Sequence, residues 1–506
     1  MSLAGNYDVR AGAVYTVLAG AAGLTKTTSG TATLAAADTY TDGTLISLGT
    51  LQLGDGNTSA TLSGSITNNA AILFNPGAAG ATYGNVISGS GSITKIGSGT
   101  VAFTPINTYQ GSTTISNGAI TLDSDATLGD GTGTLNLSGG TLTTTASRSV
   151  NANPVSNAIN LTADSAITTS STAASVDANF SSASIGGSAG TLTFSNAAAA
   201  GTGLYDPRFS GGSFTFSQPI VIANGAFGTT RLSSFNTNGT TQTFNGVISG
   251  TGAFRRSIGA GTGGVTVFNA NNTYSGATTL NGGTLLVNGA IGSGAVAVNT
   301  GTLGGNGTIN GPVTVQNSGI VSAGTSIGIL TISNSLAFLA SSTNLVEINR
   351  TIGTNDLVRG LTTVTYGGTL IVSVLSGTLA AADSFKIFDA ANYSGAFAAI
   401  IPATPGANLT WDTNSLAVNG TLKVSAVGGA QPQIATVSLS GANLILTGSG
   451  GTAGADYWVL TSTNLIQPRA AWTSIATNQF ITGGNFNFTN AVDPLKPTLF
   501  YILQVP

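Results

Sequence analysis

The chain has 506 residues with a formal net charge of −3, and only 6% of its residues are charged. Nucleic-acid binding depends on clustered Lys and Arg, and the 14 basic residues spread along this chain exclude a nucleic-acid partner. His and Cys are absent, which excludes a Ser-His-Asp triad, thiol catalysis and thiolate metal sites.

The polar residues are mainly Thr, Ser, Asn and Gly. Thr favours strands, whereas Gly, Asn and Ser favour turns, and strong helix formers such as Glu and Lys are scarce. Because 41% of the residues are hydrophobic, the chain should fold despite its low charge. No apolar run reaches the ~18–20 residues that a membrane span needs. The composition therefore predicts an almost all-β chain with no membrane span.

The first predicted strand covers Val14, Tyr15, Thr16, Val17 and Leu18. The start of the chain lacks the basic and apolar regions of a signal peptide, so we expect a secreted protein whose signal peptide is absent from this chain. Few charges protect this strand edge against partners. We therefore expect Val14, Tyr15, Val17 and Leu18 to contact another copy in a head-to-tail homopolymer.

The next segments repeat one pattern three times. Residues 24–53 and 93–122 align without a gap at a constant offset of 69 (95 − 26). The third copy starts at an offset of 161 from the second (247 − 86) and continues at 165 (274 − 109), so four residues are inserted within it. Fixed repeats of strand-like residues predict stacked structural units. The copies lie near 17–53, 86–122 and 247–287.

Apolar and polar residues alternate along these copies, and Gly or Asn separates the runs. Alternation with a period of two directs Leu, Ile, Val and Phe inward. It directs Thr and Asn outward, where we expect them to form ladders between coils of ~20–25 residues. The residues that we predict to face the interior include Ile115, Leu122, Leu135, Leu285 and Val287.

Tyrosine and lysine each recur at a fixed position of the repeat. Tyr40, Tyr109 and Tyr274 share one motif position, and we expect each ring to cover the core where the chain turns, with its hydroxyl group bonded or wet. Lys26 and Lys95 also match each other. We expect these two lysines to be solvated charges on an outward face.

Two acidic segments are the weak candidates for a chemical site. Asp123, Asp125 and Asp130 form a possible Ca²⁺ site, although the spacing of a calcium loop is missing and a solvated turn is the alternative. Residues 205–208, Tyr-Asp-Pro-Arg, are either a site loop or a local Asp–Arg pair in a turn. We expect no metal and no cofactor.

The end of the chain changes in character. Residues 352–425 are less repetitive and are predicted to form the last, broader coils. Residues 426–432 are a linker of small residues and Pro. Residues 433–506 contain several short strand candidates, which predict a small β-sandwich with a core built on Trp458 and Trp472.

The repeated pattern is G-x-Ile-x-Gly-x-Gly-x-Ile-x-Lys, followed by Asn-x-Tyr-x-Gly-x-Thr-Thr, and residues 84–122 match it best. It resembles the autotransporter-associated β-strand repeat of secreted bacterial surface proteins. The resemblance implies a right-handed parallel β-helix located outside the cell or at the cell surface. Since only about 80 residues follow, too few for the strands of a translocator barrel, we expect no such barrel.

These observations predict a right-handed parallel β-helix over residues 1–425 and a C-terminal β-sandwich over residues 433–506. The predicted function is that of an extracellular structural protein, not an enzyme, that assembles with itself into a fibre or surface layer. Adhesion is a further candidate role, with surface glycans as partners. The alternative is a β-helix that binds or cleaves carbohydrate.

Overall fold

The computed structural model of this chain describes residues 5–148, 153–181, 185–198, 202–226, 228–258, 263–427, 431–496 and 498–505. These residues form two compact units. The first unit, called the solenoid below, contains most of the chain up to residue 423. The second unit, called the C-terminal module, contains residues 424–506 with two short segments, 380–383 and 405–410. In the described part of the chain, no helix is long and apolar enough to cross a membrane.

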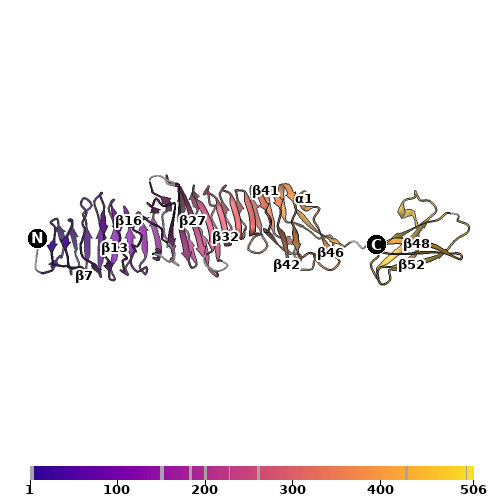
Figure 1. The fold of residues 1–506 in the computed structure, drawn as a ribbon, viewed down its shortest axis with the longest axis horizontal. Coiled ribbons are helices and arrows are strands. Elements are labelled where there is room, and N and C mark those ends of the chain that lie inside the picture. The colour runs from indigo at the N-terminus through magenta and orange to yellow at the C-terminus, as the bar shows by residue number, and fades with distance from the viewer. Residues whose placement is uncertain are drawn as a thin grey trace. The chain divides into compact units, whose positions relative to one another are not determined.

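Three parallel sheets build the first part of the solenoid, and Figure 1 shows their strands stacked in chain order. Among the described residues, one sheet has five strands: β1 (Tyr7–Asp8), β4 (Leu24–Lys26), β7 (Thr44–Ile46), β9 (Ile66–Asn68) and β12 (Ile87–Ser88). The second has nine: β2 (Gly12–Val14), β5 (Thr31–Leu34), β8 (Thr50–Leu53), β10 (Ala71–Phe74), β13 (Ser92–Lys95), β15 (Thr113–Ile115), β17 (Leu135–Ser138), β19 (Ile159–Ala163) and β22 (Ile185–Gly187). The third has eight: β11 (Ala81–Tyr83), β14 (Thr100–Phe103), β16 (Ala119–Leu122), β18 (Thr141–Thr144), β20 (Ser165–Thr169), β23 (Leu192–Asn196), β26 (Ile220–Ala223) and β29 (Ile248–Gly250). A short pair joins β3 (Ala19–Gly20) to β6 (Thr39–Tyr40).

A sheet of twenty strands, counted over the described residues, continues the solenoid. Its first ten strands are β21 (Ser175–Phe180), β24 (Gly203–Gly211), β25 (Phe214–Phe216), β27 (Gly228–Asn236), β28 (Thr241–Phe244), β30 (Ala253–Ile258), β31 (Val265–Phe268), β32 (Thr278–Val287), β33 (Ala290–Ile291) and β34 (Val296–Gly305). The other ten are β35 (Thr308–Ile309), β36 (Val313–Ala323), β37 (Ile329–Ile332), β38 (Ser335–Phe338), β39 (Thr343–Asn349), β40 (Thr354–Asn355), β41 (Leu357–Tyr366), β42 (Thr369–Ser376), β44 (Phe388–Gly395) and β45 (Ala399–Ile401). Outside this sheet, the same region contains β43 (Ser384–Lys386), β46 (Leu409–Asp412), the one-turn helix α1 (Leu416–Asn419) and β47 (Thr421–Ala426). The division between the two units falls within β46 and within β47.

In the sheets of five, nine, eight and twenty described strands, the strands pair in parallel with the strands of a neighbouring coil, apart from the antiparallel pair β39–β40. β43 and β47 also pair antiparallel. The solenoid is therefore a parallel β-helix, as the sequence predicts. Ile72 pairs with Ile93, and Leu135 pairs with Ile159. One coil therefore takes 21 residues at the first place (93 − 72) and 24 at the second (159 − 135). These values lie within the predicted range of ~20–25 residues. Other coils fall outside it, because Val296 pairs with Val313 after 17 residues (313 − 296) and Asp177 pairs with Asp206 after 29 (206 − 177).

Alternate residues of each strand fill the interior. The inward positions predicted from the alternation are confirmed, because Ile115, Leu122, Leu135, Leu285 and Val287 are all 0% exposed. Aromatic rings contact one another from coil to coil inside the solenoid, mostly edge to face or tilted. For example, the ring centroids of Phe244 and Phe268 lie 5.7 Å apart. This continuous core explains why the coils remain stacked.

Outward-facing Asn side chains form ladders between coils, and this prediction is confirmed as well. The Nδ2 atom of Asn269 donates to Oδ1 of Asn245 at 2.9 Å. In the next coil, Nδ2 of Asn288 donates to Oδ1 of Asn269 at 3.0 Å. Each amide thereby satisfies its neighbour without placing a charge on the surface.

The C-terminal module consists of two three-stranded antiparallel sheets within its described residues. One contains β48 (Gln433–Ser440), β49 (Asn443–Ser449) and β52 (Phe486–Ala491), and the other contains β51 (Thr473–Gln479), β50 (Asp456–Ser462) and β53 (Phe500–Gln504). A 3₁₀ turn, η1 (Arg469–Ala471), precedes β51. The antiparallel sheets agree with the β-sandwich predicted for this region.

The core of the module differs from the prediction. Its buried cluster consists of Leu446, Tyr457, Val459, Phe480, Phe486 and Phe488. Trp458 and Trp472 are only half-buried, so the prediction of a core built on them is wrong. Trp458 lies between Tyr457 and Val459, and strand alternation directs it to the opposite face. The indole N–H of Trp472 donates to the carbonyl of Gln467 at 3.0 Å, close to the surface.

Candidate functional site

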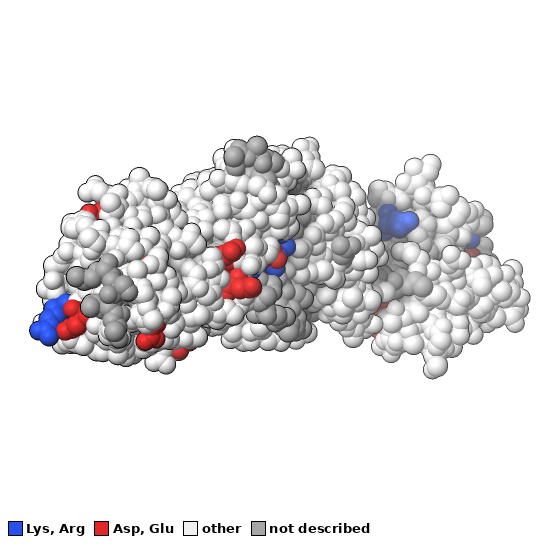
Figure 2. Space-filling view, turned by 60° about the vertical axis from the view of Figure 1, so that its left-hand side comes forward, with Lys and Arg blue, Asp and Glu red and all other residues white. Residues whose placement is uncertain are grey.

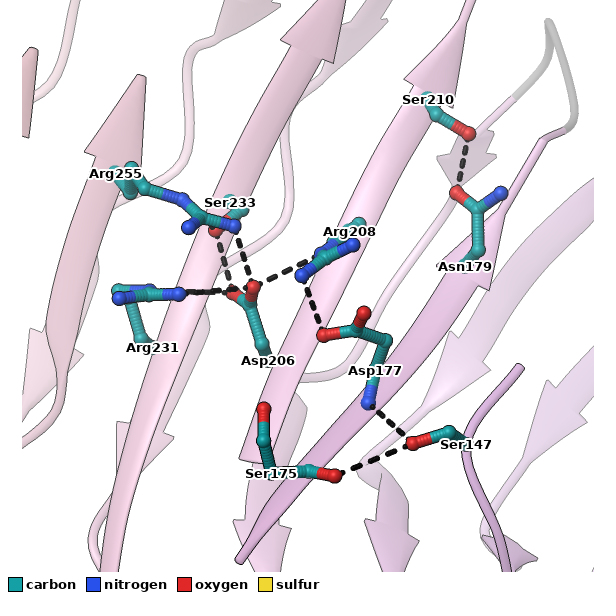
Figure 3. Close-up of polar contacts among 10 residues, drawn as sticks. All are labelled: Ser147, Ser175, Asp177, Asn179, Asp206, Arg208, Ser210, Arg231, Ser233 and Arg255. Carbon is teal, nitrogen blue, oxygen red and sulfur yellow. Dashed lines mark hydrogen bonds and ion pairs between the residues drawn. The ribbon is translucent and has the colours of Figure 1, made fainter. Parts of the chain in front are cut away.

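One cluster of charged side chains stands out on the outward face of the solenoid. It comprises Asp177 on β21, Asp206 and Arg208 on β24, Arg231 on β27 and Arg255 on β30. Strand register brings these residues together, because Asp177 pairs with Asp206. Two residues further along β24, Arg208 pairs with Ser233 of the next coil. Ser233 in turn pairs with Arg255 of the coil after that. Figure 3 shows that the charged side chains from β21, β24, β27 and β30 converge.

Asp206 is the centre of this cluster and is 0% exposed. Its carboxylate accepts hydrogen bonds from Arg208 Nε at 2.9 Å, from Arg231 Nη2 at 3.1 Å and from Arg255 Nη2 at 2.5 Å. The hydroxyl group of Ser233 donates at 2.5 Å. A carboxylate has about four lone-pair positions. Those of Asp206 are therefore occupied by the protein itself, which leaves little capacity to take up a substrate proton.

The pKa values of the two carboxyl groups are shifted in opposite directions. Burial by itself would raise the pKa of Asp206, but the hydrogen bond and charge of Arg231, with the charge of Arg255, hold that pKa below its usual range. Burial raises the pKa of Asp177, and the charge of Arg208 only partly offsets this effect. Asp206 is consequently a fixed anion, and the arginines around it act as its counter-ions.

The guanidinium groups of the cluster carry more charge than the carboxylates neutralise. Three arginines face two aspartates, so the cluster has a net charge of +1 (3 − 2). The arginine side chains remain 14–25% exposed. Arg208 and Arg255 also lie over the ring of Phe235, at 5.1 Å and 4.9 Å from its centroid. Each guanidinium has five N–H donors, so donors remain available at this surface.

The sequence prediction for residues 205–208 is partly right. The local pair exists, since Arg208 contacts Asp206 at 2.9 Å. The turn does not exist, because all four residues lie inside β24. Tyr205 and Phe209 face the core and are buried, and this alternation places Asp206 and Arg208 outward.

The other acidic candidates lie on the surface and bind neighbouring protein groups. Asp123 Oδ1 accepts from the hydroxyl of Thr145 at 2.9 Å, and Asp125 Oδ1 accepts from Asn153 Nδ2 at 3.0 Å. Asp130 Oδ1 closes a local turn by accepting from the backbone N–H of Thr132 at 2.9 Å. Over the described residues, no group of three or more acidic side chains is arranged to hold a metal ion.

The predicted assembly residues lie at a corner of the first coil. The strand β2 ends at Val14, so the prediction of a strand through Leu18 is wrong. Tyr15 and Val17 are exposed, at 65% and 43%. Leu18 is buried, and its backbone N–H donates to Oδ1 of Asp38 at 2.7 Å. This hydrogen bond holds the chain at the corner, where the chain leaves the strand.

The repeat copies contain a buried cation, which the sequence reasoning missed. Lys26, Lys95 and Arg256 are each 0% exposed, so the prediction of solvated lysines on an outward face is wrong. Lys95 Nζ donates to the carbonyl groups of Ile96, Gly97 and Asn117, at 2.6, 2.8 and 3.2 Å. Lys26 Nζ donates to the carbonyl of Leu48 in the next coil at 3.2 Å. Arg256 Nη2 donates to the carbonyl of Gly264 at 2.6 Å.

A glycine makes room for the buried cation. Gly118 has φ +64°, and a Cβ atom there would lie 2.5 Å from the carbonyl oxygens of Gly97 and Gly99 and 2.8 Å from Lys95 Nζ. Gly49 is placed in the same way beside Lys26. The alternation along the strand could have predicted this burial, because Lys95 is two residues after Ile93 and so lies on the same inward face.

The motif tyrosines occupy equivalent positions, which confirms the prediction for them. Tyr40, Tyr109 and Tyr274 are buried, and each hydroxyl lies 2.6 Å from the hydroxyl of the threonine four residues later. The preceding Asp or Asn is also equivalent. Oδ1 of Asn107 accepts the backbone N–H of Ile87 at 2.9 Å. Oδ1 of Asn272 accepts that of Ile248 at 2.8 Å.

The stacked coils define a parallel β-helix, and the three sequence repeats make the same corner contacts within it. Residues 24–53, 93–122 and 260–287 match the family model described as passenger-associated-transport-repeat. The resemblance found in the sequence is thus confirmed: the chain carries autotransporter passenger repeats and is a surface or secreted protein. No curated protein was found to match the chain.

Proposed function

We propose that this protein is a structural component of the cell surface, not an enzyme, and that it assembles with copies of itself into a fibre or surface layer. The observation that carries this proposal is that the charged and hydroxylated residues of the repeats bind other groups of the protein itself. The buried cations, the tyrosine–threonine pairs and the Asp or Asn side chains all bind the protein's own backbone or one another. They stabilise the stacking of coils and leave no free acid–base pair at these corners.

The surface supports a structural role in a second way. Figure 2 shows a face that is mostly uncharged, with only scattered groups of acidic or basic side chains. Such a surface gives little electrostatic repulsion between copies and little steering of charged ligands. Exposed apolar side chains at the corner of the first coil, Tyr15 and Val17, supply a contact that does not depend on charge.

Electron microscopy of the purified chain in negative stain tests the proposal. We expect filaments or layers for the wild type and fewer of them for the variant with Tyr15→Ser and Val17→Ser, because that variant loses the apolar corner. A variant with Leu48→Ser, another exposed apolar residue (51%), is the matched control and should assemble as the wild type does. Isolated rods at all concentrations of the wild type would contradict the proposal.

The second candidate is binding of acidic carbohydrate at the charged cluster. It is favoured by the net positive charge of the cluster and by the free guanidinium donors beside Phe235. Arginine recognises carboxylate and sulfate groups through paired N–H donors. Dextran sulfate is a suitable probe, with neutral dextran as its control. Binding to acidic carbohydrate predicts that dextran sulfate retains the wild type, and that this retention decreases as salt is added. It also predicts weaker retention of Arg231→Gln, whereas equal retention of the variant and the wild type would dismiss this candidate.

A further inference from the structure

Within its described residues, the C-terminal module leaves one edge strand uncovered. β48 is at the end of its sheet and is bonded to β49 on one side. All eight of its residues are exposed. Val437 and Leu439 are 66% and 70% exposed, although both are large and apolar. The strand therefore presents both an open row of backbone groups and an apolar face.

These two apolar side chains extend the core of the module. In the antiparallel ladder, Val437 lies opposite Leu446, which is buried in the core cluster. Leu439 lies opposite Leu444, which packs against that cluster. Since directly opposite residues share a face of the sheet, Val437 and Leu439 continue the core face beyond the area that the second sheet covers. Burying them against a further strand would complete this face.

β48 has few of the features that usually protect an edge strand. Charged residues, proline and bulges are the common means of preventing edge-to-edge pairing. β48 contains neither a charged residue nor a proline. Its ladder is irregular only between Ile434 and Thr436. The regular part of the edge is thus the segment 436–440, with Ser438 at its centre.

We propose that β48 pairs antiparallel with β48 of a second copy of this chain, about a two-fold axis at Ser438. The sequence of the strand is self-complementary in this register. Val437 of each copy lies opposite Leu439 of the other on the core face, and Thr436 lies opposite Ser440 on the other face. The strand carries no charge that would repel its copy. An isologous contact of this kind joins two modules and then closes.

This contact is separate from the proposed fibre or layer, because it uses neither the solenoid nor the corner at Tyr15 and Val17. A chain that forms cross-linked pairs but no larger assemblies would support the paired strands and contradict the fibre. Larger assemblies without cross-linked pairs would support the fibre or layer and contradict the pairing of β48.

Cysteine cross-linking of the full chain tests the proposed register. The chain has no cysteine, so a single substitution introduces the only thiol. In Ser438→Cys, the two thiols face each other across strands whose opposite Cα atoms lie about 4.5–5.5 Å apart, within the range for a disulfide. In Ser440→Cys, the matched control, the two thiols are roughly 14 Å apart along the strands. We expect oxidation to link Ser438→Cys into dimers about tenfold more efficiently than Ser440→Cys.

Sedimentation of the full chain provides a second test. Leu439→Lys places a charge on the apolar edge and should weaken dimerisation about tenfold or more. The variant should fold normally, because Leu439 is exposed in the single chain. Ile466→Lys, at a residue 93% exposed outside the strands, is the control and should leave dimerisation unchanged. A wild type that stays monomeric, a Leu439→Lys variant that dimerises equally, or equal cross-linking at both cysteine positions would overturn the proposal.

Discussion

At three corners of the solenoid, a tyrosine ring fills the core while its hydroxyl group remains hydrogen-bonded to a threonine. The same 2.6 Å contact recurs for Tyr40, Tyr109 and Tyr274. Burial raises the pKa of all three tyrosines above the usual range, so each stays neutral at physiological pH. The ring supplies apolar burial, and the threonine satisfies the one polar atom that this burial would leave unpaired.

Removing either partner of this pair should destabilise the protein. Tyr109→Phe leaves the hydroxyl of Thr113 buried without this partner, at a cost of about 1–2 kcal/mol in the free energy of unfolding. Thr113→Val should cost a similar amount. The double variant should lose less than the sum of the two, because neither polar atom is then left unpaired. Denaturant unfolding measures this cycle, and strictly additive losses would show that the two groups do not interact.

The first repeat has an Asp where the other two have Asn, and this difference should be visible in the pH dependence of stability. Asp38 is 2% exposed, and its Oδ2 atom is buried without a hydrogen-bond partner. Burial raises the pKa of Asp38 to about 6, from 3.8. The folded chain therefore binds a proton between pH 6 and pH 4 that the unfolded chain does not, and Asp38 favours folding as the pH falls through this window.

Asp38→Asn should remove this dependence and stabilise the chain at pH 7 by about 1–3 kcal/mol. The amide carries no charge and can still accept the backbone N–H of Leu18, as Asn107 accepts that of Ile87. The wild type should approach the stability of the variant as the pH is lowered from 7 to 4. Melting temperatures of both proteins over this range provide the measurement, and two parallel curves would contradict the assignment to Asp38.

At the scale of the strands, alternation was sufficient to predict the register of the core but not the nature of every inward residue. Leu122 and Ile115 are placed correctly because apolar residues at every second position have only one face to bury. Lys95 has the same phase as Ile93, yet its charge favoured an outward assignment. The corner carbonyl groups that offset the burial of Lys95 come from two different coils, and their convergence depends on the glycine turns.

The same limit applies to the charged cluster and to the C-terminal core. Asp177, Asp206, Arg231 and Arg255 are far apart in the sequence and meet only through the coil length and register. Those quantities are set by small shifts and insertions at the corners, so sequence reasoning found only the local pair of Asp206 and Arg208. In the C-terminal module, size alone suggested Trp458 for the core. The phase of the strand favours Tyr457 and Val459 instead.

The buried lysine of the second repeat should contribute to the stability of its corner. Lys95→Met keeps the length of the side chain but removes the donors to three carbonyl groups, so we expect a loss of about 1–3 kcal/mol at pH 7. Thr94→Met, at a half-buried outward position of the same strand, is the control and should change stability little. A Lys95→Met variant as stable as the wild type would show that the carbonyl groups find other partners.

The pH dependence of this effect has a definite sign. Burial lowers the pKa of Lys95 to about 8, from 10.5. Between these values the unfolded chain binds a proton that the folded chain does not, so the contribution of Lys95 to folding increases as the pH rises. The difference in stability between the wild type and Lys95→Met should therefore grow from pH 8 to pH 10, and a constant difference would contradict the shifted pKa.

At the scale of the whole molecule, each coil of the solenoid contacts mainly the coils before and after it. Stability in such an array is approximately a sum of the stabilities of the units and of the interfaces between neighbours. A local defect should therefore open nearby coils before distant ones. Leu122→Asp introduces such a defect, because Leu122 is 0% exposed and lies between Phe103 and Thr144 in the ladder of the third sheet. A carboxylate without a partner at this position should cost several kcal/mol.

Hydrogen exchange measured along the chain can locate the effect of this substitution. In Leu122→Asp, the amides of β14, β16 and β18 should exchange faster than in the wild type. Those of β34 and β36 lie many coils away and should keep their protection. Thr121→Asp, at the neighbouring outward position of β16, is the control and should leave exchange nearly unchanged, because its carboxylate remains partly solvated. Uniform acceleration over all coils would show instead that the solenoid unfolds as a single cooperative unit, and the nearest-neighbour description would then be wrong.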